Sequence, residues 1–346
     1  MTKRPRRRSK NVVTMAEVAS LAGVSTMTVS NVLNNKPSVL PERRRAVLEA
    51  MDKLNYRPNV AARALASAGS IRIGLLYRDV ENAILGAMLV GALKASVRFG
   101  FQLIIRSYDE TKPLDEVAAF AVSGIDGLLL PPPLCELASF SGISTKLSIP
   151  MIGLAPGTNL SDIPAVRIDD EVAAYEVTRL LLEKGHRRIG FVKLPGSMVG
   201  QTRLAGVQRA LAERGVVLEE RFIWEARPIY EAGLALAEMV CKMDERPTAI
   251  LAGSDDIAAA FVNVMHRCGL DVPKDISIVG FDDTPIAVKI WPALTTVRQP
   301  LAYIAEQATE RLIQMIRNPD QYTNDVIYIP HEIIQRASVS DRTLTD

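Results

Sequence analysis

The chain has 346 residues, of which 48% are hydrophobic and only 5% aromatic. This length and composition indicate two or three soluble domains whose cores consist mostly of Leu, Ile, Val and Ala. No apolar run approaches the roughly 18 residues of a membrane span, and no apolar segment of the secretory type follows the basic N-terminus. We therefore expect a cytoplasmic protein with no membrane partner.

The charge is divided unevenly along the chain. Residues 1–69 hold 13 Lys and Arg against 4 Asp and Glu, whereas the remainder holds 28 against 35. A basic head on an acidic body favours a polyanion as partner of the head alone. A solubilising tail is the alternative, and the basic run from Arg4 to Lys10 does not by itself decide between them.

The cysteines Cys135, Cys241 and Cys268 are odd in number and widely spaced. No CxxC pair or His/Cys cluster accompanies them, which argues against a disulfide framework and against a zinc site. We expect no metal and no other cofactor.

The stretch TMAEVASLAGVSTMTVSNVLNN (14–35) predicts two short helices joined by a tight turn. Thr14 is a good N-cap, and Glu17 three residues later completes a capping box. Gly23 is suited to the left-handed conformation that ends the first helix, and Ser25 is placed to cap the second. An apolar pattern at Val47, Leu48, Met51 and Leu54 predicts a third helix on which this pair packs.

The second helix leaves a polar row outside. Val29, Val32 and Leu33 face inward in this reading, and Thr26, Met27, Ser30 and Asn31 face outward. An ordinary helical hairpin explains the helices but neither the polar row nor the surrounding positive charge. The pattern predicts a helix-turn-helix whose second helix lies in the DNA major groove.

The segment LNYRPNVAARAL (54–65) follows. With the preceding motif it resembles the lactose-repressor/galactose-repressor family of bacterial transcription regulators, over residues 12 to about 338. The resemblance implies that Thr26, Met27 and Asn31 read bases and that Leu65, in a hinge helix, wedges into the minor groove. Positions that touch phosphate are matched by Ser25, Thr28, Ser30, Asn34 and Tyr56.

From residue 71 onward, buried strands alternate with helical patterns. We expect strands at 71–77, 101–107, 126–132, 149–155, 187–194, 221–226, 248–254 and 276–282. This alternation predicts an α/β body of two doubly wound parallel-sheet subdomains. The resemblance adds a periplasmic-binding-protein-like architecture in which the chain crosses between the subdomains three times.

These patterns divide the chain as follows. The predicted parts are a basic disordered tail (1–11), the all-α helix-turn-helix domain (12–57), the hinge helix and linker (58–69), the effector-binding and dimerisation domain (70–338) and a second tail (339–346). Within the large domain, the N-subdomain is predicted at about 70–163 and 293–323, and the C-subdomain at about 164–292 and 324–338.

Polar residues at strand ends form the candidate effector site, since ligands bind doubly wound sheets beyond the carboxyl ends of their strands. The resemblance places Arg203 and Asp282 on ligand-binding positions. The full expected set is Tyr77, Arg78, Asn82, Arg203, Ser254, Asp255, Asp282 and Trp291. Helix capping is the alternative role for Asp255, and hinge packing the alternative for Trp291.

The sequence therefore predicts a homodimeric regulator, a repressor that binds double-stranded operator DNA and is released by a small-molecule effector, most simply a carbohydrate. A corepressor-dependent regulator with a nucleobase-type ligand is the alternative. A solute-binding protein is an alternative for the body alone. The sequence carries no GxxxxGK[ST] loop or GxSxG elbow, so we expect no enzyme.

Overall fold

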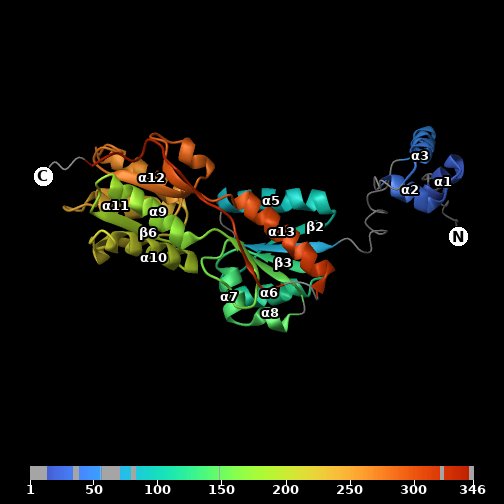
Figure 1. Cartoon of the computed structure of the whole chain (residues 1–346), viewed down its shortest axis with the longest axis horizontal. Coiled ribbons are helices and arrows are strands. Elements are labelled where there is room, and N and C mark those ends of the chain that lie inside the picture. The colour runs from blue at the N-terminus through green and yellow to red at the C-terminus, as the bar shows by residue number, and fades with distance from the viewer. Residues whose placement is uncertain are drawn as a thin grey trace, which may run out of the picture. The chain divides into compact units, whose positions relative to one another are not determined.

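The computed structural model describes residues 14–33, 39–54, 56, 71–78, 83–147, 149–319 and 323–342. The chain divides into two compact units, residues 1–70 and 71–346, here called the head and the body. Figure 1 shows the elements in chain order. None of the helices in the described ranges is long and apolar enough to cross a membrane.

The head contains the three expected helices: α1 (Met15–Ala22), α2 (Thr26–Leu33) and α3 (Pro41–Lys53). The capping box is present, because the Thr14 hydroxyl accepts a hydrogen bond from the Glu17 amide and the Thr14 amide donates to the Glu17 carboxylate. Gly23 takes φ +65°, the left-handed value expected at the turn. These predictions are confirmed.

A small apolar core holds the three helices of the head together. Its buried members are Val18, Ala19, Val29, Val32, Val47 and Ala50. Leu48, which we expected to pack inward, is 52% exposed, and Ala50 fills the core from α3 in its place. The expectation for Leu48 was wrong because the apolar stripe of α3 runs through 47, 50, 51 and 54, where helical spacing holds.

The N-subdomain is built on a six-stranded parallel sheet within the described residues, in the order β11-β5-β4-β3-β1-β2. Its strands are β1 (Arg72–Tyr77), β2 (Gln102–Ser107), β3 (Gly127–Leu130), β4 (Met151–Leu154), β5 (Ala165–Arg167) and β11 (Val326–Tyr328). Helices α5 (Ala83–Phe99) and α13 (Leu301–Arg317) lie side by side on one face (Figure 1). Helices α6 (Pro113–Ala121), α7 (Leu134–Phe140) and α8 (Ile143–Lys146) accompany the other.

The C-subdomain repeats this plan with the order β12-β10-β9-β8-β6-β7. Its strands are β6 (Ile189–Lys193), β7 (Ile223–Glu225), β8 (Ala249–Ala252), β9 (Ser277–Asp282), β10 (Thr295–Arg298) and the antiparallel β12 (Glu332–Ile334). Helices α9 (Asp170–Glu183) and α10 (Met198–Ala212) pack as one pair, and α11 (Tyr230–Cys241) and α12 (Asp255–Arg267) as another. The doubly wound α/β fold and all eight expected strands are confirmed.

The chain crosses between the subdomains later than predicted. Residues 164–167 belong to the N-subdomain because β5 pairs with β4, and β10 belongs to the C-subdomain because it pairs with β9. The third crossing follows β11, which pairs with β5. Three- and four-residue strands at the crossings carry too little alternation to be recognised in sequence.

Two further expectations were wrong. Cys241 and Cys268 form a disulfide, although they lie 27 residues apart in sequence. Each lies at the C-terminal end of one helix of the α11–α12 pair, so the packing of these helices brings the thiols together.

The second wrong expectation concerns the tail at 339–346. The Ser340 amide donates to the Ser277 hydroxyl, and the Arg342 amide donates to the Lys184 carbonyl. Residues up to 342 therefore pack on the C-subdomain.

Candidate functional site

The body holds a cavity between its two subdomains, at the carboxyl ends of β1, β6 and β9. Its empty volume is about 880 Å³, part of it open to solvent. Tyr77, Arg78, Ile84, Leu85, Met88, Pro131, Pro132, Pro133, Ala155, Leu194, Pro195, Ser197, Val199, Arg203, Pro228, Asp282, Gln299 and Leu301 line it. A mostly apolar lining with a few polar groups is typical of a site for a small organic ligand.

Arg203 supplies the buried cation of this cavity. It lies on α10, is only 3% exposed, and its Nε donates to Asp170 Oδ1 at 2.8 Å while Nη1 donates to the Gly253 carbonyl at 2.9 Å. The guanidinium also stacks on the Phe281 ring, 3.4 Å from its centroid. These contacts fix the orientation of the side chain before any ligand arrives.

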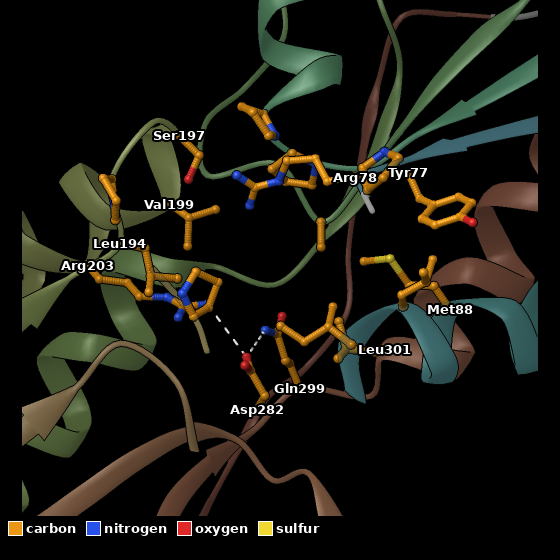
Figure 2. Close-up of a pocket in the computed structure, with 18 residues that line it drawn as sticks. Tyr77, Arg78, Met88, Leu194, Ser197, Val199, Arg203, Asp282, Gln299 and Leu301 are labelled. Carbon is orange, nitrogen blue, oxygen red and sulfur yellow. Dashed lines mark hydrogen bonds and ion pairs between the residues drawn. The ribbon is translucent and has the colours of Figure 1, made fainter. Parts of the chain in front are cut away.

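Asp282 ends β9 and faces Arg203 across the cavity wall, with Arg203 Nη2 3.9 Å from its Oδ1 (Figure 2). Gln299 donates a further hydrogen bond to Oδ1, whereas the buried Oδ2 has no hydrogen-bond partner among the described residues. Burial raises the pKa of Asp282 to about 6, and the Arg203 charge acts against this rise. A buried acceptor without a donor is costly, so Oδ2 is suited to receive a ligand hydroxyl or amide.

Backbone geometry sets the direction of Asp282. Its φ is +104° and that of Asp283 is +53°, in the left-handed region that side-chain-bearing residues rarely occupy. Asp255 holds this turn: its Oδ2 accepts the Thr284 amide at 2.6 Å and its Oδ1 accepts the Thr296 hydroxyl at 2.6 Å. The strained turn therefore rests on a buried carboxylate beneath it.

Asp255 and Ser254 do not reach the cavity, although we expected both in the effector site. Asp255 is fully buried in the network just described, and burial raises its pKa to about 7. Ser254 caps α12 through the Ile257 amide. In this structure both side chains accept from the chain's own amides, and their contact with an effector stays a prediction.

Trp291 also lies away from the cavity, with 82% of its surface exposed. It lines a separate open groove with Tyr230 and His266. Its expected stacking on a ligand stays a prediction. Asn82 lies outside the described residues.

Tyr77 and Arg78 are at the cavity, where the sequence placed them. The Tyr77 ring lies beside Met88, and Arg78 extends toward the loop that carries Ser197 (Figure 2). Sequence reasoning missed Ser197, Gln299 and the proline wall at 131–133. Gln299 stands where the chain crosses from β10 to α13, which was the one available signal for it.

In the head, the candidate DNA-binding residues gather at the start of α2. The Ser25 hydroxyl accepts the Thr28 amide at 3.1 Å, so the predicted cap is present. Thr26 and Met27 are exposed, Met27 by 68%, while Thr28 and Asn31 are half-buried. Tyr56 packs against the core of the head. The side chain of Ser30, and residues Asn34 and Leu65, lie outside the described residues.

No three metal-binding side chains gather among the residues the structure describes. Three aspartates near the cavity bind protein groups: Asp170 binds Arg203, Asp255 binds the turn at Asp282, and Asp283 binds Arg298 and Arg336.

Comparison with known proteins matches both units. Residues 14–59 fit the model described as bacterial regulatory proteins, lacI family, and residues 178–339 fit a periplasmic binding protein-like domain. The catabolite control protein A of Priestia megaterium is 31% identical over 330 residues, covering 94% of this chain and 99% of that protein. The ribose operon repressor of Haemophilus influenzae is 30% identical over 335 residues, covering 95% and 99%.

A solved structure shares the fold over nearly the whole chain. It is the lac repressor dimer bound to operator and the anti-inducer ONPF, with a TM-score of 0.77 at 24% identity, covering 95% of this chain and 99% of that one.

Proposed function

The chain belongs to the lacI family of bacterial regulatory proteins, and from that premise we propose that it is a cytoplasmic repressor released from its operator by a small molecule that enters the body's cavity. It acts by binding and not by catalysis. The observation that carries this proposal is the cavity itself, in which an oriented Arg203 and an unpaired Asp282 oxygen converge between two subdomains.

The head supplies the DNA-binding half of the proposal. A capped α2 presents exposed Thr26 and Met27 at its N-terminal end, the end that contacts base edges in helix-turn-helix proteins. Asn31 on the same helix has the bidentate amide that suits adenine, and a Thr methyl suits thymine. The lac repressor, which shares this fold, is a dimer bound to operator in its solved structure, so a homodimer here would bind a near-palindromic site with two heads.

The effector class is proposed from the cavity's polar groups. Asp282 Oδ2 accepts a donor, and Arg203 and Arg78 attract acceptors, a combination that binds hydroxyl groups. A sugar is thus the first candidate, and the name of the ribose operon repressor agrees with it. The second candidate is a nucleobase-type corepressor, which reverses the sign because the ligand then tightens DNA binding.

The test is fluorescence anisotropy of the full chain on DNA from upstream of its own gene and neighbouring genes. Salt is fixed near physiological strength, because phosphate contacts make affinity steeply salt-dependent. A panel of sugars, sugar phosphates and nucleobases is added to the complex. Release by one sugar supports the proposal, tightening supports the corepressor alternative, and no specific binding under any condition rejects the operator-binding role.

Two substitutions separate base reading from head stability. Met27→Ala removes an exposed side chain of α2, and Leu48→Ala removes one exposed by 52% on α3. We expect Met27→Ala to weaken operator binding about tenfold, as a lost base contact does, and Leu48→Ala to leave it unchanged. Equal losses in the two variants would reject the base-reading role.

The hinge role of Leu65 stays a prediction. If the side chain wedges into the minor groove, Leu65→Ala weakens binding to operator far more than binding to unrelated DNA. Equal losses on the two DNAs would exclude the wedge.

A further inference from the structure

A buried carboxylate on α7 connects the two subdomains beside the cavity. Glu136, on α7 of the N-subdomain, is 3% exposed. Its Oε1 accepts the Gly157 amide at 2.9 Å, and its Oε2 accepts the Met198 amide at 2.8 Å. Gly157 belongs to the same subdomain, whereas Met198 is the first residue of α10 in the C-subdomain. The side chain therefore spans the boundary between them.

The backbone around this contact fits closely. The Gly157 carbonyl accepts hydrogen bonds from Arg167 Nη2 at 2.9 Å and from the Thr202 hydroxyl, also across the boundary, at 2.7 Å. A Cβ added at Gly157 would lie 1.9 Å from the Val199 amide nitrogen. The N-subdomain loop thus rests directly on the first turn of α10, with no room for a water molecule or a side chain between them.

The residues on either side of this contact line the cavity. Pro133 precedes α7, and Ser197, Val199 and Arg203 come from the start of α10. Any separation of the subdomains at this edge moves the helix that carries Arg203 away from the N-subdomain wall. It must also break the hydrogen bond between the Met198 amide and Glu136.

The contact is of a strong kind. Burial raises the pKa of Glu136, while the two amide donors act against the rise because they favour the ionised carboxylate. An ionised carboxylate that accepts amides at the start of a helix makes a charge-assisted hydrogen bond and also interacts favourably with the helix dipole. Once desolvated, the carboxylate is costly without its amide partners.

We propose that Glu136 is a positioning residue of the effector site, which holds the first turn of α10, and with it Arg203, against the N-subdomain and so resists opening of the cleft at this edge. The assignment of the cavity as an effector site rests on the function proposed above. We call the contact of Glu136 with the Gly157 and Met198 amides the latch. The latch can be tested without DNA and without an effector.

The chain offers two independent ways to break the latch. Glu136→Gln keeps the shape but puts an amide NH₂ where one oxygen accepted a backbone N–H. Met198→Pro removes the donor, at the first helical position where proline is favoured. The preceding Ser197 is extended, with φ −140° and ψ 160°, as a residue before proline requires.

A matched control crosses the same boundary at the surface. Glu110 of the N-subdomain pairs with Arg227 of the C-subdomain at 3.6 Å, and both side chains are 52% exposed. Glu110→Gln therefore removes an exposed cross-boundary carboxylate, which is expected to contribute little.

The experiment is hydrogen exchange of the full chain without ligand, read on peptides covering 155–159 and 199–203. Loss of a hydrogen bond to a charged group predicts exchange about 10- to 100-fold faster there in Glu136→Gln and Met198→Pro. Glu110→Gln should exchange as the wild type does. Both substitutions act on the same contact, that of Glu136 with the first turn of α10. The double variant should therefore exchange no faster than the faster single variant.

Hydrogen exchange in the rest of the chain distinguishes this positioning role from a merely structural one. If Glu136 only stabilised the fold, Glu136→Gln would speed exchange in both sheets and lower the unfolding midpoint in proportion. Wild-type exchange at α10 in either single variant, or additive effects in the double variant, would overturn the proposal. A failed latch leaves the proposed repressor function intact, and a failed anisotropy test leaves the latch intact.

Discussion

The two subdomains share one fold but present different surfaces to the cavity between them. The C-subdomain side carries a buried polar chain in which Arg203 contacts both Asp170 and Asp282 and Asp255 supports the turn beneath. Apolar residues of this side, Leu194, Pro195, Val199 and Pro228, flank the chain. The N-subdomain side is mostly apolar, with Met88, Leu85 and three consecutive prolines, and its polar members Tyr77 and Arg78 are half-buried.

Under the function proposed above, this difference gives the two subdomains different roles in binding the effector. Groups that are fixed before binding cost no ordering on binding, so the C-subdomain provides directional recognition. The apolar wall gains most when water is expelled, so the N-subdomain provides affinity as the cleft closes. The same kind of substitution should therefore act differently on the two sides.

The largest contrast is expected at Arg203. Arg203→Met leaves Asp282 buried without its cation and removes one of the two arginines that pair with Asp170, which should lower the free energy of unfolding by about 3–5 kcal/mol. Urea denaturation followed by circular dichroism measures this loss. The control is Arg209→Met on the same helix, where the exposed pair with Glu171 should contribute less than about 1 kcal/mol. Similar losses at both positions would mean that the C-subdomain chain is not preorganised.

The next effect is expected at Asp255. Asp255→Ala leaves the buried Thr284 amide and Thr296 hydroxyl without their acceptor, which should cost about 2–3 kcal/mol of unfolding free energy. Its neighbour Asp256 is the control, since its carboxylate makes no contact with the turn among the described residues, and Asp256→Ala should cost clearly less. If Asp255→Ala left the unfolding free energy unchanged, the turn at Asp282 would not depend on this carboxylate.

A pH-dependent effect belongs to the same subdomain. His186 is 1% exposed, its Nδ1 lies 2.9 Å from the Thr248 hydroxyl, and burial lowers its pKa to about 4. A depressed histidine pKa means that the unfolded chain binds the extra proton first, so stability falls as the pH drops from about 6.5 toward 4.

Between pH 7 and pH 5 the His186 contribution to stability should fall by about 2 kcal/mol. The measurement is the difference in unfolding free energy between the wild type and His186→Gln, which cancels the opposite trend from Asp255 and Asp282, whose pKa values are raised. A difference that stays constant over this range would contradict a buried neutral imidazole.

The smallest effect on stability is expected on the other side of the cleft. Arg78 is half-buried at the end of β1, so Arg78→Met should change the unfolding free energy by less than about 0.5 kcal/mol. Release of operator DNA by the compound found in the anisotropy panel should nevertheless require more of that compound. A stability loss as large as that of Arg203→Met would remove the contrast between the two sides.

The sequence predicted the repeated architecture because each buried parallel strand leaves a continuous apolar run. It failed at the crossings, where β5, β10, β11 and β12 have three or four residues each. Whether such a segment pairs with one sheet or the other depends on long-range packing that no local pattern records. The disulfide was missed for the same reason.

The candidate site was predictable where a side chain follows a strand directly, as with Arg78 and Asp282. It was not predictable where two roles compete for one position. Asp255 follows β8 just as Asp282 ends β9, yet one carboxylate turns into the protein and the other toward the cavity. Hydrogen bonds from Thr284 and Thr296, which come from other parts of the chain, fix the orientation of Asp255.

The fit between Asp255 and β9 also restricts how this site can evolve. A Cβ at Gly280 would lie 2.2 Å from Asp255 Oδ1, so no side chain is tolerated at 280 while the carboxylate remains. The two positions should therefore change together or not at all: a lineage that acquires alanine at 280 must already have shortened residue 255. Laboratory selection for a new ligand that mutates one position at a time should therefore not recover a side chain at 280. Libraries that vary 255 and 280 at once should recover it.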